Sequence, residues 1–229
     1  MKFFIDSCDI ENISYWNDLG VGEGITTNPI IIKREGISDV EEHLKKIVAI
    51  AKEKPVSIQI TETETTKIIA QAKYFSSFGK NVVIKIPVVN AEGLSQLSLI
   101  HDLSKQGYNI NATVCLMATQ AILAAKSGAR YVSLFFGRIS DQGGDPIQII
   151  KTVRNWLDHT QLNTEIIVGS IRTVYAVNQI LMSNPHICTL TPEILNKCSY
   201  HAMSKQTASD FIKASDCVKI VMNKVIHEN

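Results

Sequence analysis

The stretch Asn81-Val82-Val83-Ile84-Lys85-Ile86-Pro87 is an apolar run that predicts a buried β-strand, and it carries a single lysine, Lys85. Short runs of β-branched residues bounded by turn signals are typical of strands in a parallel sheet. Lysine is almost never fully buried without a partner, and an ammonium held in an apolar setting tends to lose its proton. A neutral lysine is a nucleophile. The alternative is that Lys85 extends from the strand end into water.

Seven similar runs occur elsewhere in the chain, three before this one and four after it. The predicted strands are 2–6, 23–27, 56–61, 81–86, 109–114, 131–136, 165–170 and 187–190. Amphipathic helical patterns lie between or after them, at 37–52, 65–78, 91–107, 118–128, 146–159, 173–182 and 205–227. Eight strands that alternate with helical patterns predict a (β/α)₈ TIM barrel, a fold of typically about 250 residues.

Local signals support the predicted helix starts. Ser38 with Glu41 fits a capping box, and Asp145 followed by Pro146 fits an N-cap and first helical residue. The other architecture open to this alternation is an open doubly wound sheet. A dinucleotide site on such a sheet would need a G-x-G-x-x-G sequence after a strand, and the chain has none.

Composition limits the classes of function. The 229 residues are 45% hydrophobic, which is enough for one domain spanning 1–229, with 203–229 as an additional C-terminal helix. The formal net charge of +1 comes from interspersed signs, and no apolar stretch approaches the roughly 20 residues of a membrane span, so we expect neither nucleic acid nor membrane as a partner. Five cysteines without paired spacing, and the lack of a signal-peptide pattern, predict a cytoplasmic protein.

Polar residues recur where the predicted strands end, which is the edge of a parallel barrel that carries the active site. These residues are Asp6, Thr27, Asn28, Gln59, Thr61, Lys85, Asn111, Thr113, Ser133, Arg138, Ser170 and Arg172. Each has an ordinary structural alternative, such as capping the next helix. A ring of them around one lysine instead predicts a site, because buried polar groups need one another or a ligand.

The residue types favour imine chemistry. A lysine with a carboxylate and several hydrogen-bond donors suits condensation with a carbonyl, whereas the six histidines fall in or near helices or loops without forming a cluster. Cys115 has no histidine placed to activate it and is expected in the core. Arg138 and Arg172 follow neighbouring late strands, where such barrels often bind phosphate, and their charge is expected to help keep Lys85 neutral.

At this point the sequence resembles the transaldolase family, in its short form that includes fructose-6-phosphate aldolase. The strings that carry the resemblance are Phe4-Ile5-Asp6, Gly24-Ile25-Thr26-Thr27-Asn28-Pro29, Val83-Ile84-Lys85-Ile86-Pro87, Ile110-Asn111-Ala112-Thr113, Phe135-Phe136-Gly137-Arg138-Ile139 and Gly169-Ser170-Ile171-Arg172. The resemblance implies that Lys85 forms a Schiff base with the C2 ketone of a sugar phosphate and that Asp6 deprotonates the C4 hydroxyl. It implies no metal and no organic cofactor.

Further site roles follow only from the resemblance. Asn28, Asn111 and Ser133 would hold hydroxyls and the enamine, with Thr27 and Phe135 also at the substrate. Thr113 would position a water with the residue at 59. The set implied for the phosphate is Arg138, Ser170 and Arg172. Short family members lay the C-terminal helix on a neighbouring subunit and form rings of five, often paired, so a pentamer or decamer is implied.

Three positions separate the two activities of the family. Transaldolases usually have glutamate at position 59, and Gln59 instead follows the aldolases. The aldolases have tyrosine where this chain has Phe135, and Asn111 also follows the transaldolases. The balance favours transaldolase, with fructose-6-phosphate aldolase as the alternative. Two other classes stay open: a non-catalytic sugar-phosphate binder, and a different lysine aldolase, although such enzymes usually carry the lysine on a later strand.

Overall fold

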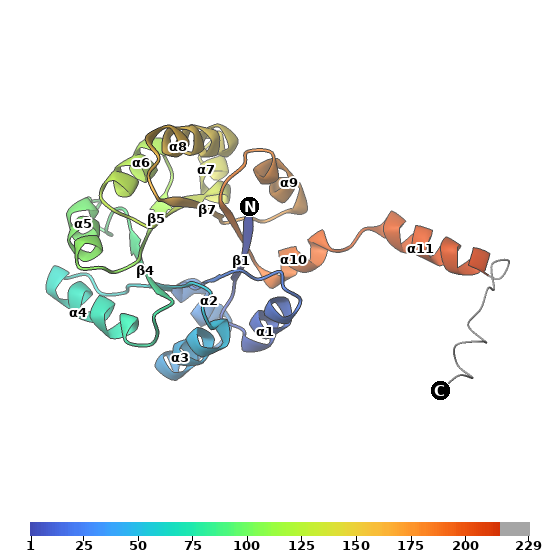
Figure 1. The fold of residues 1–229 in the computed structure, drawn as a ribbon, viewed down its shortest axis with the longest axis horizontal. Helices are drawn as coiled ribbons and strands as arrows, with labels where there is room; N and C mark the ends of the chain where they lie inside the picture. Colours follow the sequence, from blue (N-terminus) through green and yellow to red (C-terminus); the bar gives the residue numbers. More distant parts are fainter. Residues whose placement is uncertain (216–229) are drawn as a thin grey trace. The chain divides into compact units, whose positions relative to one another are not determined.

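A computed structural model describes residues 1–215, and its strands close into a single parallel barrel in chain order (Figure 1). The strands are β1 (Lys2–Asp6), β2 (Ile25–Thr26), β3 (Val56–Gln59), β4 (Val82–Pro87), β5 (Ile110–Cys115), β6 (Tyr131–Phe135), β7 (Glu165–Gly169) and β8 (Ile187–Leu190). The last strand pairs with the first, from Lys2 beside Ile187 to Ile5 beside Leu190. The predicted (β/α)₈ barrel is therefore confirmed, and the open doubly wound sheet is wrong.

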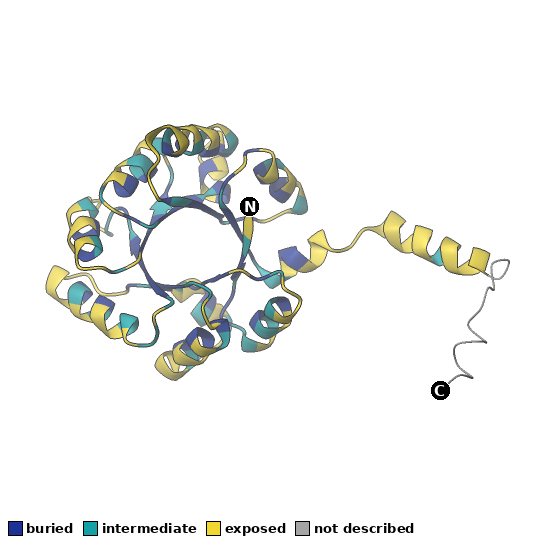
Figure 2. Ribbon diagram, viewed as in Figure 1, coloured by how far each residue is buried: buried dark blue, intermediate teal, exposed yellow. Residues whose placement is uncertain are grey.

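Within residues 1–215, nine helices surround the barrel, and their exposed sides, yellow in Figure 2, lie on the outside. They are α1 (Ile10–Asp18), α2 (Pro29–Arg34), α3 (Val40–Ala51), α4 (Thr65–Ser76), α5 (Leu97–Lys105), α6 (Ala118–Lys126), α7 (Phe136–Asp141), α8 (Pro146–Thr160) and α9 (Val174–Leu181). Two more helices follow β8 in the chain, α10 (Pro192–Cys198) and α11 (Ala202–Ala214). Among the described residues no helix is both long and apolar enough to cross a membrane.

Four of these helices were not predicted, namely α1, α2, α7 and α10, and each has nine residues or fewer. Helices this short carry little amphipathic periodicity, so their start signals are the better guide. The predicted capping box is wrong by one residue. Asp39 is the N-cap of α3 and accepts from the backbone N–H of Glu42 at 3.1 Å. The cap at Asp145 with Pro146 as first helical residue is confirmed.

Helix α5 starts at Leu97, later than the predicted helix 91–107. The preceding residues instead form a loop in which Asn90 Oδ1 accepts from the backbone N–H groups of Glu92 and Leu94. Asparagine side chains compete with helix in this way by offering the backbone a local acceptor. The loop is a feature that helical spacing alone could not show.

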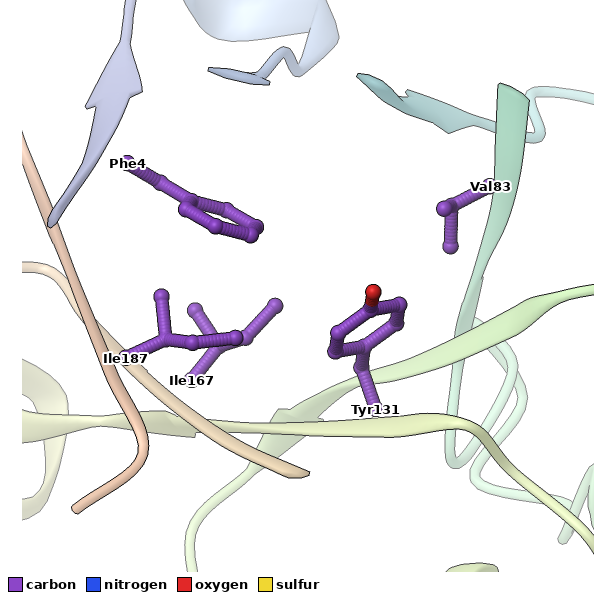
Figure 3. Close-up of a cluster of buried hydrophobic side chains, with 5 residues drawn as sticks. All are labelled: Phe4, Val83, Tyr131, Ile167 and Ile187. Carbon is purple, nitrogen blue, oxygen red and sulfur yellow. The ribbon is translucent and has the colours of Figure 1, made fainter. Parts of the chain in front are cut away.

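The barrel interior is apolar toward the N-terminal ends of its strands. Phe4, Val83, Tyr131, Ile167 and Ile187 are all buried and point toward one another from five strands (Figure 3). Phe4 and Tyr131 meet edge to face with ring centroids 6.4 Å apart. Because successive residues alternate across a strand, the inward positions two residues further along carry the next layer of the interior. That layer is polar.

A β-bulge interrupts β5 where it pairs with β6, between Ala112 and Cys115. Val114 has a φ of 61°, which a β-branched residue rarely adopts. A bulge adds one residue to a strand and re-aims the side chains around it. Thr113 lies within this irregular stretch, which therefore sets the direction of its side chain.

The compact barrel unit comprises Met1–Ile194, and a second unit begins at Leu195. In that second unit α11 exposes three large apolar side chains, Met203, Phe211 and Ile212. The predicted C-terminal helix is confirmed as far as Ala214. Its predicted continuation to residue 227 lies outside the described residues.

Candidate active site

Lys85 lies inside the barrel at the fourth strand, with only 5% of its surface exposed. Its Nζ donates to the backbone carbonyl of Thr27 at 3.0 Å. Burial lowers the pKa of the Lys85 ammonium, and the negative charge of Asp6 opposes that shift. The alternative that Lys85 extends into water is therefore wrong. Burial, rather than the two arginines expected from the sequence, is the leading cause of the lowered pKa.

Asp6 ends the first strand and shares the interior with Lys85. Its Oδ1 accepts from Thr26 Oγ1 at 2.7 Å. Since the Thr26 hydrogen is used in this way, Thr189 is the donor in the 2.6 Å hydrogen bond that joins the two threonine hydroxyls. Burial raises the pKa of the Asp6 carboxyl, while Lys85 and the Thr26 hydroxyl lower it. One pocket therefore holds a carboxylate whose pKa is raised and an amine whose pKa is lowered.

A second polar chain crosses the neighbouring strands. Asn111 Nδ2 donates to Ser57 Oγ at 3.1 Å, and Asn111 Oδ1 accepts from Ser133 Oγ at 2.7 Å. All three residues are buried. These hydrogen bonds hold the Asn111 amide between two serine hydroxyls. Asn111 pairs in register with Lys85, so this amide is held beside the amine.

Gln59 and Thr113 flank Lys85 on its two neighbouring strands. Gln59 is the register partner of Lys85, and Thr113 is the partner of Pro87. The Thr113 hydroxyl is buried and has no hydrogen-bond partner within residues 1–215. An unpaired buried hydroxyl is rare and costly. It is suited to a water or a substrate hydroxyl.

A cavity of about 350 Å³ lies at the C-terminal ends of the barrel strands. Of the predicted site residues, its walls include Asp6, Asn28, Lys85, Ser133, Phe135, Arg138, Ser170 and Arg172. Asn28 also caps α2, since its Oδ1 accepts from the Ile31 N–H at 3.0 Å. Its structural and functional interpretations are therefore compatible.

Thr27 and Gln59 do not line that cavity and instead line a different, larger one of about 620 Å³. Helices α2, α3 and α4 supply the walls of that cavity together with β3. The Thr27 hydroxyl donates to the Ser57 carbonyl at 2.9 Å, so its backbone carbonyl is the part of Thr27 that meets Lys85. Thr61 lies beyond the end of β3, where its N–H donates to Gln71 Oε1.

The far wall of the 350 Å³ cavity combines two guanidinium groups with a tight backbone turn. Gly137 donates its N–H to the Ser170 carbonyl at 2.9 Å, and a Cβ at Gly137 would lie 2.6 Å from that same oxygen. Glycine is thus required for α7 to start against the Ser170 loop. Ser170 itself has a φ of 59°. The turn brings Arg138, on α7, to the same cavity wall as Arg172.

Arg172 is held by a carboxylate. Its Nη1 and Nη2 donate to the two oxygens of Asp141 at 2.9 and 2.8 Å, and both side chains are exposed. This bidentate pair lowers the pKa of Asp141. The geometry that grips a carboxylate also suits a phosphate, which would compete with Asp141 for Arg172.

The sequence reasoning missed four residues of the site: Ser57, Thr26, Thr189 and Arg34. Thr26 could have been named, because it lies near the end of the predicted strand 23–27, and the structure makes it the register partner of Asp6. Arg34 lies on α2, a helix that was not predicted. Within the described residues there is also no group of three or more His, Cys, Asp or Glu side chains that could hold a metal ion.

Residues 3–229 match the family described as Transaldolase/Fructose-6-phosphate aldolase. A probable transaldolase of Lactiplantibacillus plantarum is 37% identical over 216 residues, which cover 94% of this chain and 96% of the relative. Probable transaldolases of Clostridium botulinum and Roseobacter denitrificans are 37% and 34% identical, covering 93% of this chain and 95% of each relative. On these full-length matches, the chain belongs to the transaldolase/fructose-6-phosphate aldolase family.

Proposed function

We propose that the protein is a transaldolase that moves a dihydroxyacetone unit from a ketose phosphate to an aldose phosphate through a Schiff base on Lys85. The observation that carries the proposal is the burial of Lys85 in a cavity that also contains Asp6 and three arginines. Burial favours the neutral amine, which is the form that attacks a carbonyl. The names of the relatives support the same activity.

The first half of the reaction cleaves the donor. Lys85 Nζ bonds to C2 of the ketose, water leaves, and the resulting iminium draws electrons. The Asp6 carboxylate takes the proton of the C4 hydroxyl, the C3–C4 bond breaks, and its electron pair moves into the iminium. An aldose phosphate departs, and a dihydroxyacetone enamine remains on Lys85.

The second half runs in reverse on another aldehyde. The enamine carbon bonds to the acceptor carbonyl carbon, the new alkoxide takes the proton held by Asp6, and water hydrolyses the iminium. Ser133 and Asn111 are proposed to hold substrate hydroxyls and the enamine near Lys85, because they form the polar layer beside it. Asn28 and Phe135 are proposed to contact the same substrate from the cavity wall.

The phosphate is proposed to bind Arg138, Arg172 and Ser170. The support is the cavity wall that these three share and the bidentate grip of Arg172 on Asp141. A phosphate dianion matches the guanidinium fork at least as well as that carboxylate does.

The water of imine formation and hydrolysis is proposed to bind Thr113 and Gln59. The support is the unpaired buried hydroxyl of Thr113 together with the register position of Gln59 beside Lys85. A glutamine can orient such a water but cannot accept its proton.

Gln59→Glu is therefore expected to accelerate transfer, on the order of tenfold, because a carboxylate can relay the proton through the water. Steady-state kcat with a ketose phosphate donor and an aldose phosphate acceptor measures the effect. The matched control is Gln106→Glu, the same change at the exposed end of α5, which should leave kcat unchanged. A slower Gln59→Glu enzyme would mean that the site is adapted to glutamine.

The activity is tested by comparing glyceraldehyde 3-phosphate release from fructose 6-phosphate with and without erythrose 4-phosphate. Release that depends on the acceptor supports transaldolase, whereas free dihydroxyacetone without acceptor would identify an aldolase. Phe135 favours the transaldolase, since phenylalanine cannot donate a hydrogen bond at the position where the aldolases have a tyrosine. Absence of a borohydride-trapped adduct would identify a non-catalytic binder.

We also propose that residues 203–229 pack on a neighbouring subunit in a pentamer or decamer. The exposed Met203, Phe211 and Ile212 of α11 support this, because large apolar side chains grouped on one helix mark association surfaces. Light scattering is expected to give five or ten times the chain mass of 25.4 kDa. A monomeric mass would contradict this assembly.

A further inference from the structure

Glu35 ties the end of α2 to the loop that follows Asp6. Its Oε1 accepts from Ser7 Oγ at 3.1 Å, and its Oε2 accepts from the backbone N–H of Cys8 at 2.9 Å. Ser7 and Cys8 are both buried, and the side chain of Glu35 is only 19% exposed. These hydrogen bonds satisfy a buried N–H that neither β1 nor α1 could satisfy. The carboxylate thus fixes the backbone directly after Asp6.

Arg34, the residue before Glu35, belongs to the wall of the cavity that contains Asp6 and Lys85. Its Nη2 lies 3.4 Å from Glu35 Oε1, an oxygen that Ser7 already occupies. The ion pair is long and the Arg34 side chain is exposed, so Glu35 does not neutralise its charge at short range. Arg34 and Glu35 therefore bring opposite charges to one side of Asp6.

We propose that Arg34 and Glu35 are positioning residues for Asp6: Glu35 holds the loop that carries it, and the opposed charges of the two set its ionisation. The inference rests on the proposed function, in which Asp6 must be ionised to accept the C4 hydroxyl proton. Arg34 favours the carboxylate and Glu35 opposes it, which agrees with their opposite effects on the pKa of Asp6.

Other groups also face Asp6, and they stay constant in the experiment. These are Lys85 on β4, Thr26 on β2, Cys8 in the following loop, and Arg138 and Arg172 across the cavity. Because none of them is changed, a shift in the titration of Asp6 reports the residue that is replaced. Opposite shifts from two adjacent residues would be difficult to obtain from a general loss of structure.

The test replaces each charge separately. Arg34→Gln is expected to raise the pKa of Asp6 and move the acidic limb of kcat/KM to higher pH. Glu35→Gln is expected to lower that pKa and move the limb to lower pH, with kcat reduced about 10- to 100-fold because the loop is less well held. Infrared titration of the protonated carboxyl band, assigned by its loss in Asp6→Asn, measures the pKa without using activity.

Two conservative variants separate charge from position. Arg34→Lys keeps the charge and should titrate as the wild type does. Glu35→Asp also keeps the charge but is too short to reach both Ser7 and Cys8, so kcat should fall without the upward or downward displacement of the limb. Glu42→Gln, on the exposed face of α3, is the control for a loss of one carboxylate and should change neither.

The electrostatic role and the positioning role can each be overturned by a separate result. Unshifted infrared titrations in Arg34→Gln and Glu35→Gln, or shifts in the same direction, would overturn the electrostatic role. A Glu35→Asp enzyme with wild-type kcat would overturn the positioning role. Arg34 is exposed, so its variant should fold even if a Glu35 variant does not. A wild-type protein without transfer activity, but with the opposite infrared shifts, would refute the proposed function and retain this inference.

Discussion

Replacing Lys85 with methionine is expected to reduce dihydroxyacetone transfer by on the order of 10⁴-fold or more, because the covalent route through the amine disappears. Methionine has a similar length and an apolar side chain, so it can occupy the same buried position in the barrel. The loss would then reflect chemistry rather than the disruption of packing. Unfolding monitored by circular dichroism would verify that the variant keeps its structure.

The direct measurement is reductive trapping. Wild-type protein incubated with fructose 6-phosphate and borohydride should gain a covalent adduct on the peptide that contains Lys85, and Lys85→Met should gain none. Lys105→Met, the same change at the exposed end of α5, is the matched control and should trap as the wild type does. An undiminished adduct in Lys85→Met would place the nucleophile elsewhere and contradict the proposed mechanism.

The barrel could be predicted because its signals are local and repeated. Each strand is a short apolar run, and β1 and β8 have the predicted bounds without change. Closure of the sheet is not a local property, and the sequence supported it only through the number of strands. The short helices α2 and α7 were missed because so few residues show no periodicity. Arg34 was missed with α2.

Site residues could be predicted where polar residues lie at the ends of predicted strands. Residues that reach the site through tertiary contacts were harder to predict. Lys85 and Asp6 could be named from their positions in two strands, and both line the 350 Å³ cavity. The ion pair of Arg172 with Asp141 could not be predicted, since the two are 31 residues apart, with Asp141 on α7 and Arg172 in the loop after β7. The hydrogen bond from the Cys8 N–H to the Glu35 carboxylate likewise depends on the position of α2 beside the end of β1.

Asp6→Asn is expected to slow transfer by about 10²- to 10⁴-fold while leaving imine formation intact, because general base catalysis is lost and the nucleophile is not. In the wild type, burial raises the pKa of Asp6, so activity should fall as the pH drops through a value above that of an ordinary aspartate. Below that value Asp6 is protonated and cannot take the C4 hydroxyl proton. In Asp6→Asn this acidic limb should be absent from the residual rate.

The same substitution changes Lys85 in a direction that can be measured. The Asp6 carboxylate raises the pKa of Lys85 against the larger effect of burial, so its removal should lower that pKa further. The amine is then neutral at lower pH, and borohydride should trap the donor on Asp6→Asn at a pH where the wild type reacts slowly. Adduct formation without turnover would separate the two roles, amine as nucleophile and carboxylate as base. If the adduct and the transfer disappeared together, Asp6 would be required to form the imine itself, and the proposed division of labour would be wrong.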